Sequence, residues 1–68
     1  MDGIEEFLRL LDDGGWHRID DVALKLGWAQ SRTRRLAEFL SEHGLVHYRE
    51  SDGSVMIDLE LLDLLTET

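Results

Sequence analysis

Apolar residues recur at the spacing of an α-helix in four stretches of this chain. They predict a first helix that ends near Asp12, a second that ends at Gly27, a third over residues 30–43 and a last one for which Asp58 is the N-cap. The apolar stripe of the third helix consists of Thr33, Leu36, Ala37 and Leu40. A stripe on one side leaves the opposite side of that helix to face solvent or a partner.

The pattern changes from helical to alternating towards the end of the chain. Residues 45–49 and 55–57 predict two strands, and Asp52-Gly53 between them is the signal of a hairpin turn. Residues 16–19 are long enough only for a brief strand that borders this hairpin. Four helices and a small antiparallel sheet indicate an α+β fold that is mainly helical.

Only a tight turn through Trp28 and Ala29 separates the second helix from the third. Two helices joined in this way are typical of a helix-turn-helix. We favour Trp28 as a hydrophobic plug between the helices over an aromatic that stacks on a base, because stacking platforms normally occur in sets beside basic residues. Asp20 is expected to cap the second helix. Ala29 has no side-chain oxygen for the third, so Ser31 is expected to cap it from a later start.

The run from Val22 to Val46 reads V-A-x-K-L-G-W-x-x-S-R-T-R-R-L-A-x-x-L-x-x-x-G-L-V. It resembles the winged helix-turn-helix domains of bacterial and archaeal transcription regulators, whose common form is I-A-x-x-L-G-L-S-x-x-T-V-x-R-x-L-x-x-L-x-x-x-G-L-I. The flanking elements extend the resemblance over most of the chain. It implies a winged helix-turn-helix with a three-helix core, a β-hairpin wing and a C-terminal helix, in a single domain over residues 1–68.

Length and composition narrow the class of protein. The 68 residues leave room for one domain with a small core. The absence of Cys excludes disulfides and thiolate metal sites. The N-terminus MDGIEEF lacks the features of a signal peptide, and no stretch approaches the roughly 20 apolar residues that span a bilayer. We expect a cytoplasmic protein without membrane contact.

The net charge of −8 counts against nucleic-acid binding, but the charges are unevenly placed. Acids concentrate in the terminal segments, whereas Arg32, Arg34 and Arg35 cluster where the third helix begins. Salt screens charges over about 8 Å, so a local cluster can outweigh distant acids. The arginines could also be solvated or paired with Glu38. We favour phosphate as their partner, because a helix N-terminus already attracts anions.

The resemblance and the arginine cluster together predict a small transcription regulator that binds double-stranded DNA as a homodimer. The helix over residues 30–43 would enter the major groove. Arg35 and Ser31 would reach base edges, while Arg32 and Arg34 would hold phosphates. The candidate DNA-binding residues are Gln30, Ser31, Arg32, Arg34, Arg35 and Arg49. The wing tip around Arg49 is acidic, so a weak wing contact is expected.

A protein-interaction module in a larger assembly is the alternative. Phe39 falls to the side of the core stripe of the third helix, which predicts partial exposure. The last helix is expected to turn Leu59, Leu62 and Leu65 towards the core. Two further leucines lie off that face, and more leucine is present than one small core needs. The candidate partner-contacting residues are Phe39, Leu61 and Leu64.

Catalytic chemistry has no recognisable pattern in this sequence. It contains no Gly-rich phosphate loop, no HExxH and no nucleophile elbow. A domain of this size also has little volume for a substrate pocket. We favour His17, His43 and His47 as solvated residues at element ends over metal ligands. We therefore expect no enzyme, no cofactor and no metal site.

Overall fold

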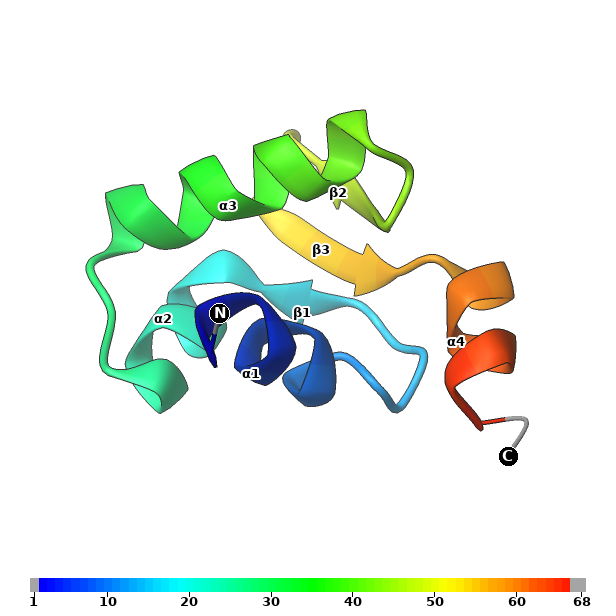
Figure 1. Cartoon of the computed structure of the whole chain (residues 1–68). Coiled ribbons are helices and arrows are strands. Elements are labelled where there is room, and N and C mark those ends of the chain that lie inside the picture. Colours follow the sequence, from blue (N-terminus) through cyan, green and yellow to red (C-terminus); the bar gives the residue numbers. More distant parts are fainter. Residues whose placement is uncertain (1, 67–68) are drawn as a thin grey trace.

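The computed structural model describes residues 2–66 of the chain, in which four helices surround a three-stranded sheet (Figure 1). The elements in chain order are α1 (Asp2–Leu10), β1 (His17–Arg18), α2 (Ile19–Leu26), α3 (Gln30–Glu42), β2 (Val46–Arg49), β3 (Ser54–Ile57) and α4 (Leu59–Thr66). The mainly helical α+β class and the winged helix-turn-helix arrangement are confirmed.

The sheet is antiparallel, and β3 lies between β1 and β2. Val55 of β3 is opposite His17 on one side and Tyr48 on the other. In the next row, Ser54 is opposite Arg18 and Arg49. The β2–β3 hairpin is the wing, and the register brings β1 alongside it.

The core lies where α1, α2 and α3 meet the sheet. Its buried apolar residues are Phe7, Leu11, Ile19, Val22, Ala37, Leu40, Val46, Val55 and Ile57. Thr33 is also buried, and its hydroxyl donates to the Ala29 carbonyl at 2.9 Å, so this polar group is satisfied. The predicted stripe of α3 is confirmed, because Thr33, Ala37 and Leu40 are buried and Leu36 packs partly against the core. The core thereby fixes which side of α3 faces outward.

The first helix is shorter than its apolar pattern predicts. α1 ends at Leu10 instead of near Asp12. The Leu11 amide donates to the Leu8 carbonyl at 3.1 Å, which tightens the chain into a turn. Leu11 is nevertheless fully buried, since the turn points it into the core. The apolar spacing therefore predicts correctly that Leu11 is buried, although α1 ends one residue before it.

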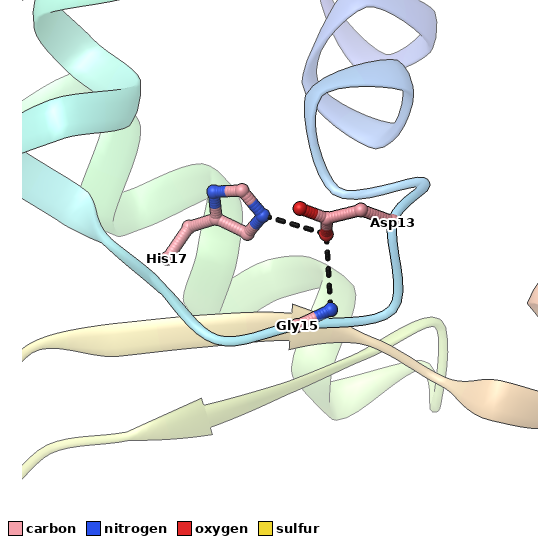
Figure 2. A network of polar contacts seen from close by, with 3 residues as sticks. All are labelled: Asp13, Gly15 and His17. Atoms are coloured by element: carbon pink, nitrogen blue, oxygen red, sulfur yellow. Dashed lines mark hydrogen bonds and ion pairs between the residues drawn. The ribbon is translucent and has the colours of Figure 1, made fainter.

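Asp13 organises the turn that joins α1 to β1. Its carboxylate accepts a hydrogen bond from the Gly15 amide at 2.9 Å and pairs with the His17 ring nitrogen Nε2 at 2.8 Å (Figure 2). The bond to His17, followed by the bond to Gly15, lowers the pKa of Asp13 below its ordinary value of 3.8. Figure 2 shows how this carboxylate ties the end of the turn to β1.

The start of α2 is held by the wing and not by a side-chain cap. The predicted cap at Asp20 is wrong, because α2 begins at Ile19 and Arg18 occupies the N-cap without a side-chain bond. The Ile19 amide donates instead to the Gly53 carbonyl at 2.8 Å. Asp20 lies inside the first turn, where a negative charge still favours the helix.

α4 follows β3 and lies at one end of the molecule, where Figure 1 draws it in orange and red. Asp58 caps it as predicted, because its carboxylate accepts from the Leu61 amide at 3.1 Å. The predicted packing face is wrong in part. Leu62 packs against the core as expected, but Leu61 packs there too, whereas Leu59 and Leu65 are exposed.

Candidate nucleic-acid interface

The turn between α2 and α3 sets the direction in which α3 leaves the body. Gly27 ends α2 with a φ of 73°, a left-handed conformation that glycine adopts without strain. The Trp28 amide then donates to the Ala23 carbonyl at 2.9 Å. This pattern closes α2 and starts the new direction within two residues.

Trp28 packs between this turn and α1. Its ring stacks on Phe7 with 6.4 Å between the centroids and 10° between the planes. A Cβ added at Gly3 would lie 3.4 Å from the same indole. Trp28 packs against the core as a hydrophobic plug would, but the contacts that hold it are with α1, and they place the start of α3 against the N-terminal helix.

The Trp28 ring also positions the first of the three arginines. The guanidinium carbon of Arg32 lies 4.5 Å from the ring centroid, within the range of a cation–π contact. Arg32 is therefore held beside the turn while it remains exposed. Its position is set by the fold and does not depend on a ligand.

α3 gathers five of the six candidate DNA-binding residues on its first two turns. The exposed residues of this set are Gln30, Ser31, Arg32, Arg34 and Arg35. Ser31 and Arg35 are four residues apart and share one side of the helix. The opposite side carries the buried stripe, so this surface faces away from the core. Throughout, we call these five residues the α3 basic surface.

The arginines of the second turn of α3, Arg34 and Arg35, have no acidic partner among the described side chains. Among residues 3–66, neither Arg34 nor Arg35 forms an ion pair, so the alternative pairing with Glu38 does not occur. The same i, i+4 spacing does produce a pair on α1, where Arg9 lies 2.8 Å from Glu5. Within these residues, the guanidinium groups of Arg34 and Arg35 are therefore open to an external anion.

The start of α3 lacks both a cap and an acidic residue. Ala29 occupies the N-cap with no side-chain hydrogen bond, as its side chain requires. The predicted capping by Ser31 is wrong, because α3 begins at Gln30 and includes Ser31. First-turn amides and the positive end of the helix dipole thus add to the charge of Arg32. Their combined field favours an anion at this end of α3.

The sixth candidate, Arg49, lies on the wing, where it is already engaged. Its Nε and Nη2 atoms donate to the Asp52 carboxylate at 3.1 and 2.8 Å. Its guanidinium carbon also lies 4.2 Å from the ring centroid of Trp16. The bond to Asp52 raises the pKa of Arg49, and the same bond lowers that of Asp52. Arg49 thus has a carboxylate partner in its own chain, whereas Arg34 and Arg35 have none within residues 3–66.

The candidate partner-contacting residues lie on two different helices. Phe39 on α3 is 51% exposed, and Leu64 on α4 is 66% exposed. Leu61 differs from them because it packs partly against the core. Leu64 is thus the more accessible of the two α4 candidates.

Two of the three histidines have carboxylate partners, and His17, whose side chain is only 19% exposed, is not the solvated residue that the sequence predicts. His17 pairs with Asp13, and the His47 ring nitrogen Nε2 lies 3.0 Å from the Asp58 carboxylate. Across the described part of the chain, no three His, Cys, Asp or Glu side chains gather as a metal site would require. In the same residues, no helix is long and apolar enough to cross a membrane.

Reasoning from the sequence did not anticipate the two aromatic contacts that place arginines. Trp28 and Arg32 are four residues apart, a spacing that brings side chains together once the turn leads directly into the helix. Trp16 and Arg49 are distant in sequence and meet only through the β1–β3–β2 order of the sheet. The spacing in the sequence could have predicted the contact between Trp28 and Arg32, but no local pattern predicts the contact between Trp16 and Arg49.

The comparison with protein families identifies a family for most of the chain. A family model described as the IclR helix-turn-helix domain matches residues 6–50. This segment contains α2, the turn and α3, and it extends to the end of β2. Searches of curated proteins and of solved structures found no significant match.

Proposed function

The chain belongs to the IclR helix-turn-helix domain family, a class of DNA-binding regulatory domains, and from that membership we propose that α3 is its recognition helix. A domain of this family regulates transcription and is not a catalytic unit. We propose that it acts on double-stranded DNA in the cytoplasm.

The observation that carries the proposal is the α3 basic surface. Arg34 and Arg35 are exposed and without acidic partners among residues 3–66, and Arg32 is held beside them by Trp28. A DNA phosphate would supply the negative charge that the N-terminal end of α3 lacks. We assign Arg32 and Arg34 to phosphates and Arg35 to a base edge, where a guanidinium bonds guanine through two hydrogen bonds.

Gln30 and Ser31 complete the contact at the N-terminal end of α3. Recognition helices present their first residues to base edges, and both side chains carry hydrogen-bonding groups. Glu38 and Glu42 follow further along and repel phosphates. Glu38 still suits a cytosine amino group, which donates a hydrogen bond. The affinity of the domain is therefore concentrated in the first half of α3.

We further propose that the domain functions as a homodimer, which would double the number of arginines that meet the DNA. The leucines Leu59, Leu64 and Leu65 of α4 are exposed, and burying them in a second copy removes apolar surface from water. Sedimentation equilibrium of the wild type and of Leu64→Glu tests this. A monomer at all concentrations would contradict it.

The alternative function is a protein-interaction module. The net charge of −8 and the exposed Phe39 and α4 leucines favour it. In that case the arginines of α3 would contribute nothing to DNA binding.

Charge reversal separates the two functions. Arg34→Glu with Arg35→Glu should weaken binding to a pool of labelled genomic duplexes by at least about a hundredfold, measured by fluorescence anisotropy at low salt. A matched control, Arg9→Glu with Lys25→Glu, makes the same change in net charge on exposed positions of α1 and α2. It should change the affinity by less than about threefold.

The experiment has two outcomes that would contradict DNA binding through α3. Equal weakening by both double variants would mean that only net charge matters and would contradict the assignment to α3. Absence of binding by a wild type that circular dichroism shows to be folded would sink the DNA-binding proposal and favour the interaction module.

A further inference from the structure

Phe39 is an unusual residue for the outward part of α3. This helix is mostly polar on its outer side, yet the phenyl ring of Phe39 is 51% exposed. Among the aromatic rings of the described residues it contacts His43, with 4.5 Å between the centroids and 57° between the planes. The fold therefore leaves about half of a large apolar side chain in water without covering it.

The helical spacing places Phe39 on the same side of α3 as two arginines. It follows Arg35 by four residues and Arg32 by seven, the separations at which side chains of a helix stack along one side. Its ring thus extends the α3 basic surface towards the C-terminal end of the helix. A ligand that reaches Arg35 along this side meets Phe39 next.

We propose that Phe39 is a specificity-determining residue that contacts the C5-methyl group of a thymine in the major groove. The thymine methyl is an apolar group on the groove floor, and Phe is among the side chains that contact it. Four residues of helix rise about 6 Å, and successive base pairs are about 3.4 Å apart. The thymine should lie about two base pairs from the base that Arg35 contacts.

The neighbouring charges favour a base edge over the phosphate backbone as the partner of this half of α3. Glu38 and Glu42 precede and follow Phe39 and are both exposed. They oppose close approach to phosphates, but they do not oppose a neutral methyl group. The inference rests on the proposed DNA binding by α3.

The test compares thymine with uracil, which lacks only the methyl group. A bound sequence is first selected from a pool of random duplexes with the wild-type protein. Each thymine of that sequence is then replaced singly by deoxyuridine, and the affinity is measured by fluorescence anisotropy. The protein should bind the duplex with deoxyuridine at one particular position about three- to fivefold more weakly, as expected for the loss of one buried methyl group.

Variants tie that position to Phe39. Phe39→Ala should bind the thymine and uracil duplexes equally, while Phe39→Leu should keep part of the preference. Leu24→Ala is the matched control, because it removes an exposed apolar side chain from α2. It should keep the full difference. Circular dichroism confirms that each variant is folded.

Three results would overturn the inference while leaving DNA binding by α3 intact. They are a selection without any preferred sequence, a selected sequence in which no single thymine matters, and a Phe39→Ala variant that keeps the thymine preference. The third would reassign the exposed ring to a protein contact. A wild type that binds no duplex at all would instead refute the proposed function, and this inference with it.

Discussion

α2 and α3 are consecutive helices, but their charges are arranged in opposite ways. α2 has Asp20 and Asp21 in its first turn and Lys25 in its last, which complements the helix dipole. α3 has no acid in its first turn, places Arg32 there, and has no basic residue in its last turn. The charges of α2 stabilise the helix that carries them, whereas those of α3 do not.

The same difference extends to the rest of the fold. The charged contacts of the described residues lie in α1, β1, α2, β2 and the turns beside them. We call α1, α2, the sheet, α4 and their turns the supporting elements. The ion pairs are Glu5–Arg9, Arg18–Asp20 and Arg49–Asp52, and the His–carboxylate hydrogen bonds are Asp13–His17 and His47–Asp58. We infer that the supporting elements use charge for stability, while α3 holds charge for a partner.

Acidification should have the largest effect, because it acts on several supporting elements together. The pKa of Asp13 is lowered mainly by His17, that of Asp52 by Arg49 and that of Asp58 by the Leu61 amide. Since these values lie below the unfolded value of 3.8, the stabilisation is complete above that pH and is lost as the pH falls through the folded values.

The variant Asp13→Asn tests this dependence. It should be less stable than the wild type near pH 6, and the difference should shrink as the pH drops below 3.8. Urea unfolding followed by circular dichroism across a pH series measures it. A stability difference that stays constant down to about pH 2.5 would show that the Asp13 carboxylate contributes no charge-dependent stabilisation.

The next largest effect is expected from substitutions at Ala29, which should separate the stability of α3 from its DNA binding. The N-cap backbone there has φ −66° and ψ 145°, which suits Ser and Asp. Ala29→Ser and Ala29→Asp should each raise the free energy of unfolding by about 0.5–2 kcal/mol. Only Ala29→Asp should weaken DNA binding, because it brings a negative charge to the phosphate side. Equal DNA affinity of the two variants would contradict the proposed division between stability and binding.

Asp52→Asn should make Arg49 on the wing comparable to Arg34 and Arg35 of α3, which form no ion pair within residues 3–66. Arg49 loses its carboxylate partner and becomes able to exchange it for a phosphate. The slope of log affinity against log salt should steepen by about 0.9 for each additional phosphate that the wing neutralises. An unchanged slope, measured by anisotropy, would mean that Arg49 does not reach the DNA.

Asp21→Asn should produce the smallest effect. Removing one first-turn acid from α2 should lower the free energy of unfolding by about 0.3–1 kcal/mol and leave DNA affinity within about twofold. Chemical denaturation and anisotropy give the two values. A large change in affinity with unchanged stability would place α2 in the interface and would remove the difference between the helices.

Much of the fold follows from local patterns. The spacing of Thr33, Ala37 and Leu40 determines the buried side of α3, and Gly27 marks the end of α2. The Asp-Gly pair before β3 predicts the wing turn. The α3 basic surface was equally predictable, because it depends on residues within two turns of one helix.

The remaining features depend on contacts between distant parts of the chain. The start of α2 uses the Gly53 carbonyl, which only the wing brings within reach of Ile19. In α4, leucines occur on more than one side, so the pattern cannot determine that Leu61 packs inward and Leu65 does not. The engagement of Arg49 by Trp16 likewise follows from the strand order.

A salt series on the wild-type protein tests the central claim most directly. If Arg32 and Arg34 of each copy in a dimer neutralise phosphates, the affinity for labelled duplex should fall by about a hundredfold between about 50 and 200 mM salt. The Arg34→Glu and Arg35→Glu variant should lose most of this dependence together with its affinity. A folded wild-type protein that binds no duplex at low salt would contradict the account.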